Sequence, residues 1–303
     1  MLNDILQNDP ELEKRLQGMA ISNNEVKTSE EYVNPETGEV NPNFIYPDDE
    51  LPNMSILMPT YNRRNFIGLI AVNLANMNYP KDKLELVIYD DHPDNPLFLN
   101  NEEVLIFQER IQIKVNYIYN CVRHLSIGEK RNKLVKAAKY KICINMDDDD
   151  IYLEQYFKTS VTLLKQNKAG IVGSPEMLFT YPHLDYKMSG IRCESKRQIH
   201  EATFCFTKQH WKSMGGFVSK GESSSRGEGA KMIDFNEKKC VKSNIGDCMV
   251  CISHKNNTVD KMRFVDSNCD AIEFNIPDIY KTLIDEILSI KRSEPSVNQT
   301  TNQ

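Results

Sequence analysis

The sequence lacks any long apolar run, and this absence excludes several classes of protein. No stretch of its 303 residues reaches the roughly 20 apolar residues that a membrane-spanning helix needs. The first 20 residues carry six charged side chains and have no apolar core of the kind found in a secretory signal peptide. We therefore expect a soluble, cytoplasmic protein without an integral membrane segment, which a partner protein would have to recruit to a membrane surface.

The sequence also lacks an excess of positive charge and a regular spacing of cysteines. Its net charge of −6 disfavours nucleic acid as a partner, so any phosphate site must be local. The eight cysteines show no disulfide-framework spacing, which suits reduced thiols. One series, Cys240, Cys248, Cys251 and His254, has residue types that bind zinc, although residues 248–252 are interpreted more simply as a buried strand.

Four consecutive aspartates at residues 147–150 follow the apolar run 142–146 and form the densest charge in the chain. Neighbouring carboxylates resist joint ionisation, so such a cluster is costly unless a cation or hydrogen-bond donors neutralise it. Oxygen ligands favour a hard cation, Mg2+ or Mn2+, over zinc. Because Mg2+ held by one or two carboxylates keeps positions free for phosphate oxygens, the cluster predicts a metal site that meets a phosphate-bearing ligand.

Two other interpretations of the aspartate cluster have to be compared with this one. An EF-hand loop starting at Asp147 would put Tyr152 where the sharp turn needs glycine and Lys158 where the bidentate glutamate belongs, so the sequence excludes it. A solvated acidic turn stays open, because blocks of like charge are usually exposed.

The pattern of apolar segments predicts one large α/β domain with polar ends. Residues 1–52 are polar and rich in turn formers, which indicates an arm or lid. From residue 53 to 275 short apolar runs alternate with helix-length segments, as in βαβ units, first in a regular half (53–150) and then in a less regular half (151–275). Residues 276–303 predict a helix and a polar tail. The predicted strands are 55–58, 84–89, 113–119, 141–145 and 169–173, and the predicted helices are 65–78, 128–139, 152–166 and 278–291.

Polar residues follow three of these predicted strands. They lie at 59–64, at 90–94 and at 147–150, and a predicted helix begins at Gly128 with Lys130 and Arg131 in its first turn. Ligands of open α/β sheets bind beyond the carboxyl ends of the strands, and helix N-termini with nearby cations favour phosphate. The sequence therefore predicts a single site at this edge of the sheet.

The order of these segments resembles family 2 glycosyltransferases with the GT-A fold. Four segments carry the resemblance, which covers about residues 54–260: the Pro-Thr-Tyr-Asn-Arg turn at 59–63, the acid pair Asp90 and Asp91, the helix start at 128–132, and a D-x-D motif within 147–150. The resemblance implies a nucleotide-diphospho-sugar transferase fold, with a Rossmann-like, mostly parallel sheet and an α+β extension on the acceptor side.

The resemblance also implies roles for individual residues. The residues implied to bind the donor's base, ribose and diphosphate are Pro59, Thr60, Asn62, Arg63, Asp90, Asp91, Lys130, Arg131, Asp147 and Asp148. Those implied to hold Mn2+ or Mg2+ are Asp147, Asp149, Asp150 and His254. Each assignment has a structural alternative: a turn for the acid pair at 90–91, a solvated helix face for the cations at 130–131, and a structural role for the histidine.

The second half of the chain resembles the acceptor side of the family, with one departure. Residues 200–204, Trp211 and residues 215–217 resemble the segments ahead of a catalytic acid that usually belongs to a Glu-Asp pair. Here the place reads Gly227, Glu228, Gly229, so the aspartate is missing. Glu228 is the predicted general base, with Glu222 in reserve, and a plain loop carboxylate is the alternative. Trp211 fits core packing better than stacking on a sugar.

These observations together predict transfer of a sugar from a nucleotide diphosphate sugar, most simply a UDP-sugar, to a hydroxyl of a glycan, glycoprotein or glycolipid. With Glu228 as base the transfer would invert the anomeric configuration. A nucleotidyltransferase is the alternative enzyme, although residues 59–64 contain no glycine for its phosphate loop. A catalytically silent module that binds sugar nucleotides or glycans is the alternative outside enzymes.

Overall fold

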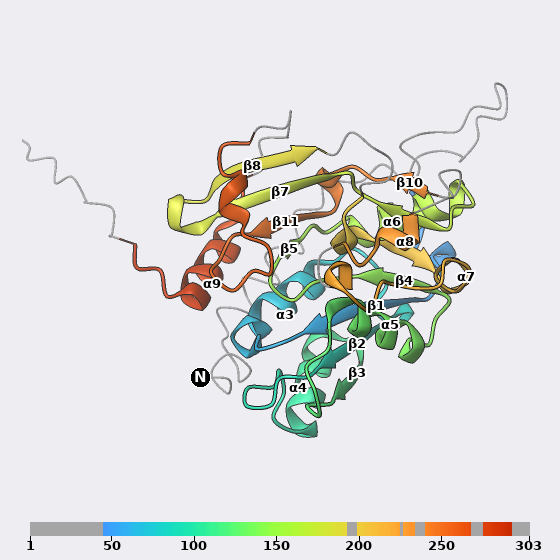
Figure 1. Cartoon of the computed structure of the whole chain (residues 1–303), viewed down its shortest axis with the longest axis horizontal. Coiled ribbons are helices and arrows are strands. Elements are labelled where there is room, and N and C mark those ends of the chain that lie inside the picture. The colour runs from blue at the N-terminus through green and yellow to red at the C-terminus, as the bar shows by residue number, and fades with distance from the viewer. Residues whose placement is uncertain (1–44, 193–198, 225–226, 234–239, 268–274, 293–303) are drawn as a thin grey trace, which may run out of the picture.

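The computed structural model describes residues 45–192, 199–224, 227–233, 240–267 and 275–292. Within these ranges the chain forms a seven-stranded sheet, a four-stranded sheet and the helices that cover them (Figure 1). Most of the predicted arm, 1–52, and the last residues of the predicted tail lie outside the described ranges.

The larger sheet has the strand order β10-β6-β9-β4-β1-β2-β3. Its strands are β1 (Met54–Thr60), β2 (Leu84–Asp90), β3 (Lys114–Tyr119), β4 (Ile142–Asn145), β6 (Ile171–Gly173), β9 (Cys205–Thr207) and β10 (Cys240–Lys242). The four strands β4-β1-β2-β3 are parallel. Strand β2 is buried along its whole length, as expected for the centre of a parallel sheet covered on both faces.

The register of the parallel strands gathers their carboxyl ends at one edge. Thr60 pairs with Asp90, and Leu57 pairs with Asn145, so the segments that follow β1, β2 and β4 leave the sheet side by side. The polar turn and the acid pair begin in the last residues of β1 and β2, and the four aspartates follow β4. The predicted convergence of these segments at one sheet edge is therefore confirmed.

The helices of the first half connect the parallel strands and cover the sheet. They are α3 (Ile67–Asn76), α4 (Asn101–Ile111) and α5 (Ile127–Ala137), and α6 (Tyr156–Gln166) follows in the second half. Helix α5 begins with a capping box, in which the Ser126 side chain accepts from the Glu129 N–H and the Glu129 carboxylate accepts from the Ser126 N–H. This cap fixes where α5 begins and therefore the place of Lys130 and Arg131 beside the strand ends.

The smaller sheet has the order β5-β11-β7-β8 and belongs to the second half of the chain. Its strands are β5 (Ile151–Tyr152), β7 (Glu176–Tyr181), β8 (Lys187–Arg192) and β11 (Met249–Ile252). The remaining helices are α7 (Lys208–Ser213), α8 (Ala230–Ile233) and α9 (Asp278–Leu288). Figure 1 shows β8, β7 and β11 above strands β4, β1, β2 and β3 of the larger sheet in that view, and α9 packs beside α3.

The predicted strands are confirmed, with ends that match or shift by one or two residues. One predicted helix begins too early: residues 151–152 form β5, because Val250 and Met249 of β11 pair with them, and α6 starts only at Tyr156. Helix α4 was not predicted, although Asn100 caps it by accepting from the Glu103 N–H. The final helix starts after Pro277 as predicted and ends at Leu288.

Candidate functional site

The four aspartates follow β4, and each of them contacts a cationic side chain of another segment. Asp147 Oδ1 lies 2.9 Å from Arg131 Nη2, and Asp150 Oδ1 lies 3.0 Å from Lys261 Nζ. Arg63 contacts the two middle aspartates. Its Nε lies 3.5 Å from Asp148 Oδ1, and its Nη2 lies 3.0 Å from Asp149 Oδ2. The protein's own cations therefore offset much of the repulsion within the cluster.

The aspartate cluster is more buried than an ordinary acidic turn. Asp148 and Asp150 are buried, with only 7% and 4% of their surface exposed. Asp150 Oδ1 also accepts from the Ile252 N–H of β11, which joins the cluster to the smaller sheet. Asp147 is more open, with 27% of its side chain exposed. The interpretation as a solvated turn is therefore wrong.

The four aspartates also differ in their affinity for protons. Burial raises the pKa of Asp148 well above its usual value, and the neighbouring charge of Asp149 adds to this. Burial also raises the pKa of Asp150, against the opposing charge of Lys261. Burial would raise the pKa of Asp149 too, but the hydrogen bond from His254 and the charge of Lys261 hold it below its usual range. The surroundings of Asp149 thus favour its ionised form, whereas those of Asp148 and Asp150 favour the protonated form.

His254 follows β11 and faces Asp149. Its Nε2 lies 3.1 Å from Asp149 Oδ2, and its Nδ1 lies 3.2 Å from the Asn256 N–H. Because a backbone N–H can only donate, Nδ1 accepts from Asn256. Nε2 lies between the Asp149 carboxylate and the side-chain amide nitrogen of Asn257, which is 2.9 Å away.

The carboxylates of the aspartate cluster and the ring of His254 fit a divalent ion only in part. Within the described ranges, no three His, Cys, Asp or Glu side chains are grouped so that they could hold a metal ion. Asp149 and His254 supply two neighbouring ligand groups, and Asp147 opens to the same cavities. A hard cation that keeps positions for substrate phosphate oxygens needs only one or two protein carboxylates, so this set fits an ion that enters together with a phosphate ligand. The cysteine and histidine series at 240–254 forms no such group in the described residues either.

A first cavity, of about 270 Å3, opens between the turn after β1, the start of α5 and the aspartates. Its lining holds the predicted residues Pro59, Thr60, Arg63, Lys130, Arg131, Asp147, Asp148 and Asp149. Tyr61 and His124 also line it, with ring centroids 4.2 Å apart, and Lys130 Nζ lies 5.1 Å from the centroid of Tyr61. An aromatic pair beside cations suits a flat base and a phosphate chain.

The acid pair after β2 is enclosed by the protein. Asp90 accepts hydrogen bonds from the His92 and Leu97 N–H groups and from the Tyr117 hydroxyl. Asp91 accepts from the Leu125 N–H and lies 2.5 Å from Lys130 Nζ, which also donates to the Thr60 carbonyl.

Both carboxylates of the acid pair are 1% exposed, and neither lines the first cavity. Asp90 shapes the turn after β2, and Asp91 fixes Lys130 in the wall of the cavity. Asn62 lies at the left-handed position of the neighbouring turn, with φ 57°, and accepts from Asn95 Nδ2.

A second cavity, of about 290 Å3, shares Ile127, Arg131, Asp147, Asp149 and Thr258 with the first and extends towards the smaller sheet. Its lining includes the predicted base Glu228 and a second glutamate, Glu201. Glu228 Oε1 accepts from Arg131 Nε at 3.0 Å, so Arg131 bridges Glu228 and Asp147. The Arg131 side chain is 3% exposed, which makes this bridge a buried link between the two cavities.

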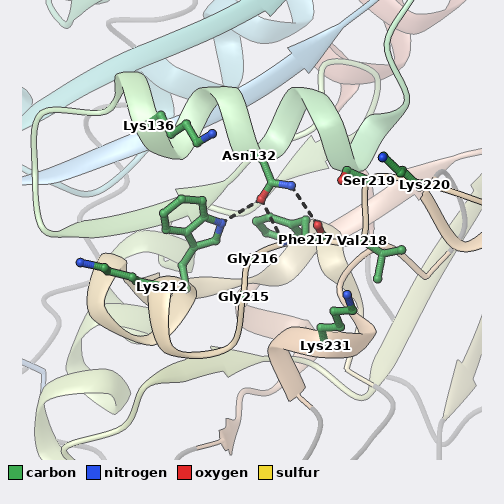
Figure 2. A pocket seen from close by; sticks show the side chains of 11 residues that line it. Asn132, Lys136, Lys212, Gly215, Gly216, Phe217, Val218, Ser219, Lys220 and Lys231 are labelled. Atoms are coloured by element: carbon green, nitrogen blue, oxygen red, sulfur yellow. Dashed lines mark hydrogen bonds between the residues drawn. The ribbon is translucent and has the colours of Figure 1, made fainter.

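A third hollow, of about 470 Å3, lies on the other side of α5 and contains none of these acids (Figure 2). Figure 2 shows Asn132 at its centre, accepting from Trp211 Nε1 and the Phe217 N–H and donating to the Phe217 carbonyl. The next residue, Val218, donates its N–H to the Glu228 carbonyl. Trp211 packs against the core beside α5, as its packing interpretation predicted.

The prediction from sequence missed Tyr61, His124 and Glu201, which line the cavities, and Lys261, which contacts Asp150. Tyr61 lies within the predicted turn at 59–63, and His124 lines the same cavity as that turn. In the sequence, only the aromatic character of the two side chains could have indicated a role. Glu201 lies within residues 200–204, which the sequence assigned only to a strand ahead of the base. Its carboxylate comes close to Glu228 through the tertiary fold, because Gly229 donates its N–H to Glu201 Oε1 at 3.2 Å.

The fold and this site define a class: an α/β protein of the glycosyltransferase GT-A type, with a carboxylate-lined site at the carboxyl edge of a mostly parallel sheet. The profile of glycosyl transferase family 2 matches residues 55–218, more than half of the chain. The chain belongs to glycosyl transferase family 2.

Individual relatives are distant. Poly(ribitol-phosphate) β-N-acetylglucosaminyltransferase TarS of Staphylococcus aureus is 23% identical over 120 residues, which cover 39% of this chain and 20% of that relative. The matched segment thus spans only a fifth of the relative's length.

Two solved structures share the fold. The mannosyltransferase PcManGT from Pyrobaculum calidifontis, in complex with GDP-Man and Mn2+, aligns with a TM-score of 0.52 and 17% identity, over 70% of this chain and 60% of that one. S. aureus TarS 1–349 in complex with UDP-GlcNAc aligns with a TM-score of 0.52 and 13% identity, over 78% of this chain and 65% of that one. In the described part of our chain, no helix has both the length and the apolar character needed to cross a bilayer.

Proposed function

We propose that this protein transfers a hexose-type sugar from a nucleotide diphosphate sugar to an acceptor hydroxyl, with inversion at the anomeric carbon. One observation carries the proposal: the two cavities meet at Arg131, Asp147 and Asp149. The first cavity has the cations and aromatic rings that a nucleotide diphosphate needs, and the second has carboxylates that can receive a proton. Donor and acceptor would then meet at the aspartates.

The donor would occupy the first cavity. Tyr61 and His124 would contact the base, and the turn after β1 and Lys130 would border the ribose and diphosphate. Arg131, held by Asp147 and Glu228, supplies a fixed positive charge where the diphosphate departs. GDP-Man and UDP-GlcNAc in the related solved structures support a nucleotide-sugar donor, and a UDP-sugar is our first choice.

A divalent ion, Mn2+ or Mg2+, belongs to this proposal. Asp149 and His254 would hold it, with Asp147 beside them and Asp150 supporting the segment from behind. When bound, the ion would offset the charge that develops on the leaving diphosphate. The Mn2+ in the solved mannosyltransferase supports such an ion.

The acceptor would occupy the second cavity, next to the carboxylate pair of Glu228 and Glu201. Its hydroxyl attacks the anomeric carbon from the face opposite the diphosphate, which inverts the configuration. A glycan or glycoconjugate acceptor fits the mixed lining, in which Met177, Phe179 and Phe264 offer apolar surface beside the acids.

Binding of the donor can be measured without knowledge of the acceptor. We expect UDP-GlcNAc, UDP-glucose or GDP-mannose, each added with Mn2+, to raise the melting temperature of the protein, because a ligand at about 100 times its Kd stabilises the folded state by about 2.7 kcal/mol. The measurement is a thermal-shift scan over these donors, with UMP and Mn2+ alone as controls. A scan in which no nucleotide diphosphate stabilises the protein more than the controls would contradict the proposal.

A further inference from the structure

Glu201 fills the space beside Gly229 in the wall of the second cavity. A Cβ atom added at Gly229 would lie 2.5 Å from Glu201 Cγ and 2.6 Å from Phe204 Cε2, which is closer than real Cβ contacts allow. The glycine is therefore needed so that the Glu201 side chain can lie across it. The Gly229 N–H then donates to Glu201 Oε1 and fixes the direction of the carboxylate.

The backbone around Glu201 is held from several sides. Residues 201–203 form a short 3-10 helix, and the Glu201 carbonyl accepts from Asn145 Nδ2, at the end of β4, at 2.6 Å. The Ala202 carbonyl accepts from the hydroxyls of Tyr152 and Tyr156 at 3.3 Å each. These bonds tie Glu201 to the strand that delivers the aspartates, so its carboxylate has a fixed place relative to Asp147.

Glu201 and Glu228 line the same cavity but are engaged differently. The Glu228 carboxylate is held by the buried Arg131, and only 6% of the Glu228 side chain is exposed. For Glu201, no cationic side chain among the described residues contacts the carboxylate, which leaves it open to a hydroxyl in the cavity. Glu228 acts on Arg131, whereas Glu201 is available to the acceptor.

The charged surroundings of Glu201 suit a proton acceptor at neutral pH. Burial raises the pKa of Glu201 to about 7, the charge of Glu228 adds to this, and Arg131 opposes it. His200 is the next residue in the chain and also lines the cavity, as does Asp147. A base whose pKa lies near the working pH combines an ionised carboxylate with enough affinity for the transferred proton.

We propose that Glu201 is the general base of the transfer reaction and that Glu228 is a positioning residue that holds Arg131. The acceptor oxygen forms a bond to the anomeric carbon, and the bond from that carbon to the diphosphate oxygen breaks. The electron pair leaves with the diphosphate, while the hydroxyl proton moves to a carboxylate oxygen of Glu201. This assignment rests on the proposed glycosyl transfer.

The test compares Glu201→Gln, Glu201→Asp and Glu228→Gln with Glu286→Gln, an exposed glutamate on α9, as the matched control. We expect Glu201→Gln to lower kcat by about a hundredfold or more, with the thermal shift given by the donor unchanged. Glu201→Asp should recover part of the loss, because it keeps a carboxylate. Glu286→Gln should match the wild-type protein in both measurements.

The pH profile of kcat separates catalysis from packing. The base must be ionised, so wild-type kcat should rise with pH, reach half of its plateau near pH 7 and level off about one pH unit higher. Glu228→Gln removes a charge that raises the pKa of Glu201, so its rise should move to lower pH. Loss of turnover in Glu228→Gln with full turnover in Glu201→Gln would overturn the assignment while leaving the transferase proposal intact. Wild-type protein that turns over no donor would contradict both proposals.

Discussion

Asp149→Ala is expected to lower turnover of a nucleotide sugar about a thousandfold, which corresponds to about 4 kcal/mol of transition-state stabilisation. The surroundings of Asp149 favour its ionised form, and Asp149 lines both cavities. Its removal takes away the carboxylate that would hold the divalent ion beside the diphosphate. The measurement is kcat/KM for donor turnover at saturating Mn2+, with folding checked by circular dichroism.

The matched control is Asp82→Ala, in an exposed turn ahead of β2 and far from the cluster along the chain. It should leave kcat/KM and the melting temperature unchanged. Asp149→Asn adds a second comparison, because it keeps the shape and removes the charge. If Asp149→Asn and Asp149→Ala both retain wild-type turnover, the aspartates do not serve the reaction.

Arg131→Met is expected to lower both stability and turnover. The side chain is buried and bridges Asp147 and Glu228, so its loss leaves two carboxylates without their shared cation. Removing one partner of a buried ion pair costs about 3 to 5 kcal/mol, which corresponds to a fall in melting temperature of roughly 10 °C for a domain of this size. Turnover should also fall, since the fixed charge beside the leaving diphosphate is gone.

Arg192→Met provides the comparison for Arg131→Met, because Arg192 forms an ion pair with Glu176 at the surface, with 66% of its side chain exposed. It should change the melting temperature little. Thermal unfolding and donor turnover are measured for both variants. An Arg131→Met protein as stable and as active as Arg192→Met would show that the buried bridge contributes neither to the fold nor to the site.

The parallel half of the fold could be predicted because its signals are local. Strands β1, β2 and β4 are short apolar runs that end in polar residues, and the capping box of Ser126 and Glu129 marks the start of α5. Because these strands are parallel, their carboxyl ends lie at the same edge of the sheet. For that reason the turn at 59–63, the cations of α5 and the aspartates could be placed at one site from the sequence.

The partners within the site could not be predicted in the same way. Arg63 reaches the aspartates across 86 positions of the chain, and Lys261 reaches Asp150 across 111. A run of four acids predicts a need for neutralisation, but it does not say whether a metal ion or protein cations supply it. Here protein cations contact all four carboxylates, and metal binding stays a prediction.

The second half was harder because its strands join sheets through tertiary pairing. Strand β9 has only three residues and inserts antiparallel between β4 and β6, a place that no local pattern indicates. The contact of Glu201 with Gly229 spans 28 positions and depends on that arrangement. The need for glycine at position 229 can be recognised only from the fold, which shows that Glu201 fills the space beside it.

The release of nucleoside diphosphate from a nucleotide sugar by the wild-type protein tests the central claim most directly. The assay adds UDP-GlcNAc, UDP-glucose or GDP-mannose with Mn2+ and identifies the nucleotide product by chromatography. Our account predicts UDP or GDP as the product, with the release stopped by EDTA and lost in Asp149→Ala. Release of a nucleoside monophosphate or pyrophosphate, or no product from any donor, would contradict it.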